Sequence, residues 1–153
     1  MQTPTTFRYI ETPEDQQHSF SLMRELRPHL DDALAYARQL NRQTQDGYRL
    51  LGAFEDDALL GLIGFRRMEN LIYGRFIYVD DLIVDTPKRH HRLGAMLLQV
   101  AREQAQQQDC AHLVLDTGSH MSLAQRFYFR EGLLARGMHF VQLLKTETES
   151  SHA

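Results

Sequence analysis

Apolar and polar residues follow regular patterns along the chain, and these patterns predict six strands and four helices. Leu30, Leu34, Ala37 and Leu40 recur at helical spacing, whereas β-branched and aromatic residues cluster between residues 73 and 84 as in a strand. The predicted strands cover residues 6–11, 48–55, 59–68, 73–84, 112–115 and 137–144. The predicted helices cover residues 12–27, 29–43, 92–108 and 119–131.

Residues that start or stop regular structure separate these elements. Thr12-Pro13 is typical of a helix start, with a hydroxyl cap followed by proline in the first turn. Pro28 interrupts the first helix, and Gly132 stops the last one. The order β-α-α-β-β-β-α-β-α-β predicts an α/β fold, a mixed central sheet with helices on both faces.

Length and composition limit the class of protein. A chain of 153 residues, 42% hydrophobic and 24% charged, predicts a single domain over residues 1–153, with residues 145–153 as a flexible tail. The net charge of −3 argues against nucleic-acid binding. The sequence shows no signal peptide and no apolar run long enough to cross a membrane, so we expect no membrane association and a cytoplasmic location. Cys110 is the single cysteine, which excludes an intrachain disulfide and fits a small apolar residue.

The segment from Asp80 to Leu98 carries the most functional information. It predicts an apolar strand, a basic turn and the first turn of a helix. The first N–H groups of a helix lack intrahelical partners and lie at the positive end of the helix dipole. Such a junction suits a phosphate group. The adjacent histidines His90 and His91 have no third ligand nearby, so we expect no metal site.

The residues of this junction and of a second segment resemble the GNAT superfamily of acyl-CoA-dependent N-acetyltransferases over nearly the whole chain. The family motif Arg/Gln-x-x-Gly-x-Gly/Ala matches Arg89 to Gly94, except that Arg92 replaces the middle glycine. Downstream, Ala124, Tyr128 and Gly132 have the spacing of a second family motif. Met121 stands where many members have asparagine.

The resemblance implies acetyl-CoA as the cofactor and a set of residues that hold it. The turn and helix start are expected to cradle the pyrophosphate. The resemblance also implies that the central strand bulges and splays from its neighbour, so that its free backbone pairs with pantetheine. The Leu82 N–H is expected to polarise the thioester carbonyl. The expected cofactor-binding residues are Leu82, Ile83, Val84, Arg89, His90, His91, Arg92, Leu93, Gly94 and Ala95.

Two side chains are candidates for proton transfer. Strand alternation predicts that Asp80 and Asp81 point to opposite faces, with Asp80 on the side of Leu82, and we favour Asp80 as the general base. Asp81 then has a structural or substrate-binding role. Asp116 is a reserve base, or a cap of the helix that follows it. Tyr128 is expected to protonate the CoA thiolate, because a phenol is protonated at neutral pH.

Other residues and functions remain open. Several other residues could line the pocket for the acceptor or could pack in the core. They are Tyr36, Tyr48, Tyr73, His139 and Phe140, and the junction at Pro28 could form a pocket wall. The predicted function is acetyl transfer from acetyl-CoA to a primary amine by direct attack. Two alternatives are a non-catalytic acyl-CoA sensor on the same fold and a helical-interface protein without a cofactor. The acceptor is a small molecule or a peptide, and the acidic residues favour a cationic amine. The resemblance also allows a homodimer.

Overall fold

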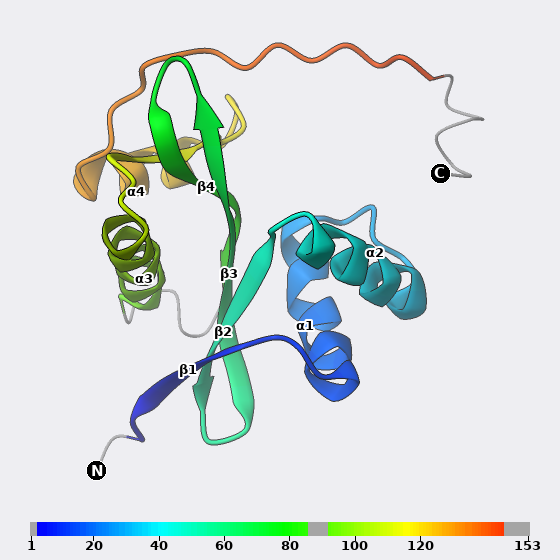
Figure 1. Cartoon of the computed structure of the whole chain (residues 1–153). Coiled ribbons are helices and arrows are strands. Elements are labelled where there is room, and N and C mark those ends of the chain that lie inside the picture. Colours follow the sequence, from blue (N-terminus) through cyan, green and yellow to red (C-terminus); the bar gives the residue numbers. More distant parts are fainter. Residues whose placement is uncertain (1–2, 86–91, 146–153) are drawn as a thin grey trace. The chain divides into compact units, whose positions relative to one another are not determined.

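The computed structural model describes residues 3–85 and 92–145 (Figure 1). Its elements in chain order are β1 (Thr5–Tyr9), α1 (Pro13–Leu26), α2 (Ala33–Gln45), β2 (Arg49–Glu55), β3 (Ala58–Asn70), β4 (Gly74–Val84), α3 (Leu93–Gln107), β5 (His112–Leu115) and α4 (Ser122–Arg130). They fall into two compact units, residues 1–115 and 116–153.

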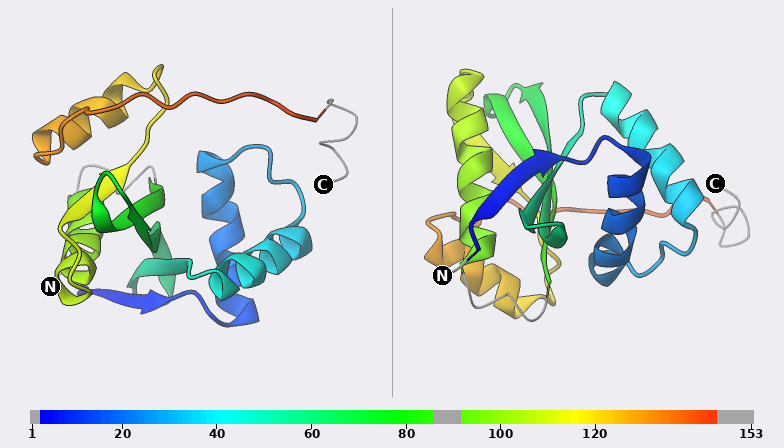
Figure 2. Two further views of the ribbon diagram at one scale, coloured as in Figure 1. Left: turned by 45° about the horizontal axis from the view of Figure 1, so that its top comes forward. Right: turned by 90° about the horizontal axis from the view of Figure 1, so that it is seen from below.

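The first unit holds a five-stranded mixed sheet in the order β1-β2-β3-β4-β5. Neighbouring strands from β1 to β4 are antiparallel, whereas β5 runs parallel to β4 after the crossover through α3. Helices α1 and α2 cover one face of this sheet and α3 covers the other, as Figures 1 and 2 show. This arrangement confirms the predicted α/β fold class.

Each face of the sheet has its own apolar core. Beneath α3, Leu97 and Ala101 pack against strand residues such as Ile63 and Ile77. Beneath α1 and α2, the core includes Met23, Leu40 and Phe54 and also buries the aromatic rings of Tyr36 and Tyr48. The second core is therefore the more polar of the two, because it contains two phenol hydroxyls that need partners.

Most element boundaries lie within a few residues of the prediction, and the start of α1 is confirmed in detail. Thr12 caps the helix by accepting a hydrogen bond from the Asp15 N–H at 3.1 Å, and Pro13 is its first residue. The second helix begins four residues later than predicted, because Asp32 rather than His29 supplies its cap through a bond from the Leu34 N–H.

The predicted strand at residues 137–144 is wrong, since the structure has no secondary structure there. A strand requires a ladder partner, and local alternation of residues does not provide one. Large apolar side chains of this segment are exposed: Met138, Phe140, Val141, Leu143 and Leu144. The prediction of a flexible tail at residues 145–153 falls almost wholly outside the described residues. The single-domain prediction stays a prediction.

Candidate active site

A β-bulge in β4 brings both predicted acids to the same face of the sheet. Phe65 of β3 pairs with Val79 and Gly64 pairs with Asp81, so Asp80 is an extra residue in β4. Asp80 and Asp81 both line one pocket on the side of α1 and α2. The predicted opposite orientation of the two acids is therefore wrong, because the bulge interrupts the alternation on which it depended.

The bulge also separates Asp80 from Leu82. The Leu82 side chain packs against the core beneath α3, on the face opposite the pocket. The prediction that Asp80 shares a side with Leu82 is wrong for the same reason. The backbone of Leu82 nevertheless lies only two residues along the strand from Asp80.

Asp80 forms a two-point ion pair with an arginine of the neighbouring strand. Arg66 donates from Nη2 and Nε to the two carboxylate oxygens at 2.9 and 3.0 Å. Burial raises the pKa of Asp80 above its usual value of 3.8, and the Arg66 hydrogen bond opposes that rise. A carboxylate with a raised pKa is a better proton acceptor near neutral pH than an exposed aspartate.

Asp81 has both carboxylate oxygens occupied. Arg27, at the end of α1, donates from Nε to Oδ1 at 3.1 Å, and Tyr48 donates its hydroxyl to Oδ2 at 2.7 Å. Gly64 makes the second contact possible, because a Cβ atom there would lie 2.5 Å from Cζ of Tyr48. Asp81 is consequently tied into the fold from two sides.

The pocket that contains these acids, which we name the aspartate pocket, has a volume of about 210 Å³. It lies between the α1–α2 layer and β4 and is lined by Met23, Arg27, His29, Leu30, Tyr36, Gln39, Leu40, Gln43, Tyr48, Asp80 and Asp81. The pocket is therefore large enough for several waters or a small organic molecule.

Both pocket tyrosines hold their protons firmly. Burial raises the pKa of Tyr36 to about 12, and its hydroxyl shares a 2.9 Å hydrogen bond with Ser19. Burial and then the negative charge of Asp81 raise the pKa of Tyr48 well above 10. Neither phenol is therefore a proton acceptor, and Tyr48 serves as the donor that holds Asp81. These two residues line the pocket, whereas Tyr73 contacts Phe76 and His112 outside it.

Near the pocket, some backbone N–H groups of β4 point away from the neighbouring strand β3. The Asp85 N–H donates to the Leu60 carbonyl of β3 at 2.8 Å. Because hydrogen-bonded and non-hydrogen-bonded pairs alternate in an antiparallel ladder, the Leu82 N–H points away from β3. On that outer side β5 pairs with β4 only over Phe76–Val79. The Leu82 amide therefore lies beyond the paired stretch, as a thioester-binding amide should.

The same alternation distinguishes the other two predicted strand residues. The Val84 N–H points to the same outer side as that of Leu82, in agreement with a pantetheine contact. Ile83 lies in a hydrogen-bonded pair with Leu62 and turns its backbone toward β3. The pairing thus gives no support to the predicted backbone contact from Ile83.

The start of α3 offers N–H groups without side-chain caps. Arg92 is the N-cap and makes no capping hydrogen bond, so the first-turn amides of Leu93, Gly94 and Ala95 have no side-chain partner at the cap. This arrangement fits a pyrophosphate. Arg92 has φ of 60°, the left-handed conformation that glycine adopts without strain. Arg92 thus has a backbone conformation that favours glycine, the residue that the family motif has at this position. Arg89, His90 and His91 lie outside the described residues.

The remaining candidates belong to the second unit. Tyr128 lies in α4 and is half-buried, with its ring centroid 5.4 Å from that of Phe127. Asp116 pairs with His139 at 3.3 Å and does not cap α4, whose N-cap is Met121. The capping role considered for Asp116 is therefore wrong. Phe140 is 84% exposed.

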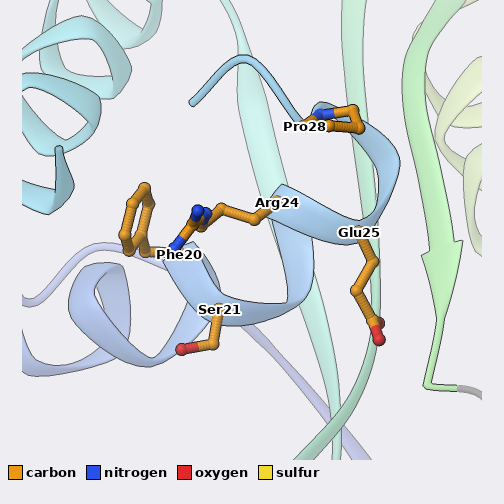
Figure 3. A pocket seen from close by; sticks show the side chains of 5 residues that line it. All are labelled: Phe20, Ser21, Arg24, Glu25 and Pro28. Carbon is orange, nitrogen blue, oxygen red and sulfur yellow. The ribbon is translucent and has the colours of Figure 1, made fainter. Parts of the chain in front are cut away.

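A larger hollow, of about 380 Å³, lies on the outer side of α1 (Figure 3). Arg24 reaches toward the ring of Phe20, whereas Ser21 and Glu25 point away from it. Its polar groups do not converge on one point, so the aspartate pocket is the better candidate site. Among the described residues, no group of three or more potential ligands could hold a metal ion, and no helix is long and apolar enough to span a membrane.

Three functional residues were not predicted from the sequence: Arg27, Arg66 and Gly64. Two acids in an apolar strand require cationic partners, which is a signal that such residues exist. The sequence does not show which arginines face the strand, because β3 and α1 meet β4 only in the folded chain. The junction at Pro28, considered as a pocket wall, contributes Arg27, His29 and Leu30 to the aspartate pocket, whereas Pro28 itself lines the outer hollow.

The site combines a carboxylate-lined pocket, an outward-facing strand amide and a helix start suited to a phosphate, which together define a group-transfer enzyme using a phosphorylated carrier. Comparison with known proteins agrees. Residues 10–132 match the model of the acetyltransferase (GNAT) family. An uncharacterized N-acetyltransferase, YhdJ, from Bacillus subtilis is 28% identical over 79% of this chain and 85% of its own.

A further relative and a solved structure are also similar to this chain. The aminoalkylphosphonate N-acetyltransferase of Salmonella typhimurium is 28% identical over 87% of this chain and 88% of its own. The solved structure of AAC(6')-Iy with the bisubstrate analogue CoA-S-monomethyl-acetylneamine has a TM-score of 0.81, with 14% identity over 94% of this chain and 99% of that one.

The chain belongs to the GNAT family and is an acetyl-CoA-dependent N-acetyltransferase. This outcome confirms the predicted family, enzyme class and cofactor. It also excludes a helical-interface protein without a cofactor and favours an enzyme over an acyl-CoA sensor. The cytoplasmic location stays a prediction.

Proposed function

We propose that the enzyme transfers the acetyl group of acetyl-CoA to a small primary amine by direct attack, with Asp80 as the general base. The observation that carries this proposal is the bulge in β4. It turns Asp80 into the aspartate pocket while the Leu82 amide faces the outer side of the same strand. Acetyl-CoA supplies the acetyl group as a thioester.

Asp80 takes a proton from the bound ammonium ion, directly or through a water molecule. The resulting amine forms the C–N bond while the C–S bond breaks. The Leu82 N–H donates a hydrogen bond to the carbonyl oxygen as negative charge develops there. Tyr128 protonates the departing thiolate, and water restores the phenol proton and takes the second proton from the nitrogen. The role of Tyr128 is supported by its place in the family motif on α4.

The acceptor is proposed to be small and to carry polar or anionic groups. The volume of the aspartate pocket suits a small molecule better than a long peptide. Arg66 and Arg27 balance the charges of Asp80 and Asp81, so the pocket lacks the excess negative charge that would select a polycation. This proposal differs from the preference for a cationic amine that the acidic residues alone suggested. The name of one relative, an aminoalkylphosphonate N-acetyltransferase, agrees with a small amine acceptor that carries an anionic group.

The test is thiol release from acetyl-CoA across a panel of amines that includes aminoalkylphosphonates, amino sugars, polyamines and lysine peptides. We expect turnover with a small amine. In Asp80→Asn and in Tyr128→Phe, kcat should fall by a factor of about 100 or more, whereas calorimetry should show that acetyl-CoA still binds. Full turnover in either variant would remove that residue from the mechanism. Binding of acetyl-CoA without turnover of any amine would favour the sensor.

We further propose that a second copy of the chain covers residues 137–144. Apolar side chains occur at both alternating sets of positions in this segment, for example Phe140 on one side and Val141 on the other, and both are more than 80% exposed. A strand with two apolar sides is typical of burial on both faces. Sedimentation velocity is expected to show a dimer that Phe140→Asp weakens, and a monomer at all concentrations would contradict this proposal.

A further inference from the structure

At the bulge in β4, the backbone carbonyl of Asp80 lies outside the ladder between β3 and β4, and a side chain donates a hydrogen bond to it. Asp80 has no partner residue in β3. Arg27 donates from Nη2 to the Asp80 carbonyl oxygen at 2.7 Å and from Nε to Asp81 Oδ1 at 3.1 Å. One guanidinium thus binds both the backbone of the bulge and the next carboxylate.

Arg27 is itself held in place by the end of α1. It is the C-cap of that helix, and its N–H donates to the Met23 carbonyl at 2.8 Å. The next residue, Pro28, cannot continue the helix. A cation at a helix C-terminus is also favoured by the helix dipole. The guanidinium therefore starts from a fixed point opposite the bulge.

We infer that Arg27 is a positioning residue for acetyl transfer: it holds the bulge so that Asp80 faces the aspartate pocket while Asp81 stays bound to Arg27 and Tyr48. This inference rests on the proposed role of Asp80. Arg27 acts through the strand and not through contact with the reacting nitrogen. Tyr48 supports the same arrangement from the opposite side by binding Asp81 Oδ2.

The charges around Asp80 give this role a measurable consequence. Asp80 is faced by Arg66 from β3, Asp81 from β4, Arg27 from the C-cap of α1 and Tyr48 from the residue before β2. The pocket wall adds His29 and Tyr36. The positive charge of Arg27 lowers the pKa of Asp80, in opposition to burial. Loss of that charge should raise the pH at which Asp80 gains its proton.

The experiment compares Arg27→Gln and Arg27→Lys with a matched control, Arg24→Ala. Arg24 lies one turn earlier on α1 and contacts only the ring of Phe20. In Arg27→Gln we expect kcat to fall about tenfold to 100-fold through misplacement of the base. The acidic limb of the pH–rate profile should shift to higher pH, with KM for acetyl-CoA unchanged. In Arg27→Lys the acidic limb should return to its wild-type pH, because the positive charge is kept. Only part of kcat should return, because lysine cannot make both contacts in the same geometry. Arg24→Ala should leave both unchanged.

A carbon-13 NMR titration of Asp80 separates failure of this inference from failure of the proposed function. The Asp80 carboxyl should titrate at higher pH in Arg27→Gln, and its backbone carbonyl signal should shift, whether or not any amine is acetylated. An unshifted titration and an unshifted carbonyl would overturn the positioning role. A pH–rate limb that stays in place in an active Arg27→Gln enzyme would also overturn it. Shifted NMR signals with normal kcat in Asp80→Asn would instead refute Asp80 as the base.

Discussion

Replacement of Gly64 by alanine tests whether this glycine is required for the contact between Tyr48 and Asp81. An added Cβ atom would lie 2.5 Å from Cζ and 2.8 Å from Cε2 of Tyr48, closer than packed carbon atoms approach. The Tyr48 side chain is only 1% exposed, so its ring cannot swing into solvent. The ring must shift within the core beneath α1 and α2, and its hydroxyl must move away from Asp81.

Two costs follow from that shift. Adding a methyl group to a well-packed core typically destabilises a protein by about 2 kcal/mol. Loss of a buried hydrogen bond to a charged acceptor costs about 1.5–3 kcal/mol. Because a partial shift relieves some of the first cost at the expense of the second, we expect Gly64→Ala to lower the free energy of unfolding by about 3 kcal/mol. Equilibrium urea unfolding measures this change, with an unchanged m-value as the sign of an intact two-state transition.

The control variant is Gly137→Ala, where an added Cβ meets no atom within 4 Å. Its unfolding free energy should stay within about 0.5 kcal/mol of the wild type. The double variant Gly64→Ala with Tyr48→Phe should cost less than the sum of the single variants, because the same hydrogen bond can be lost only once. Additive costs, or a Gly64→Ala protein as stable as the control, would refute the proposed packing of Tyr48 over Gly64.

Two other residues give predictions on stability. Arg92→Gly should change the free energy of unfolding by no more than about 1 kcal/mol, because relief of the left-handed backbone strain offsets the greater backbone entropy of glycine in the unfolded state. Urea unfolding measures this change, and a loss of stability well above about 1 kcal/mol would contradict the strain argument. Asp15 is bound by Arg8 at 3.0 and 3.1 Å, which lowers the pKa of Asp15 below 3.8. Its ion pair therefore stabilises the fold above the unfolded pKa, and this contribution is lost as pH falls through the folded one. Asp15→Asn should be less stable at pH 7 and should lose less stability on acidification than the wild type, and parallel pH–stability curves would contradict this.

The sequence predicted well those features that depend on local signals. Thr12 and Pro13 define a helix start through bonds within four residues, so the pattern alone suffices. Among the residues predicted at helical spacing, Leu40 of α2 is likewise buried, whereas Leu34 of the same set is 59% exposed. Fold class followed from the order of such elements, and the family motifs supplied the enzyme class and cofactor.

The geometry of the candidate site was not predictable in the same way. The pairing of Asp80 with Arg66 depends on the register between β3 and β4, which no local pattern specifies. The bulge inverts the side on which one residue lies, so strict alternation misplaced Asp80 relative to Leu82. The segment 137–144 failed for a related reason: its apolar residues are strand-like, but a strand needs a partner that the sequence does not identify.

The bulge links these errors to the chemistry, because a regular strand could not support the proposed mechanism. In a regular β4, Asp80 and Asp81 would face opposite sides, and one carboxylate would enter the apolar core beneath α3. The extra residue places both on the more polar side, where Arg66, Arg27 and Tyr48 bind them. Beyond the bulge the pairing resumes at Gly64 and Asp81, which fixes the outward direction of the Leu82 amide. A single inserted residue therefore sets the position of the proposed base and of the proposed carbonyl-binding amide at once.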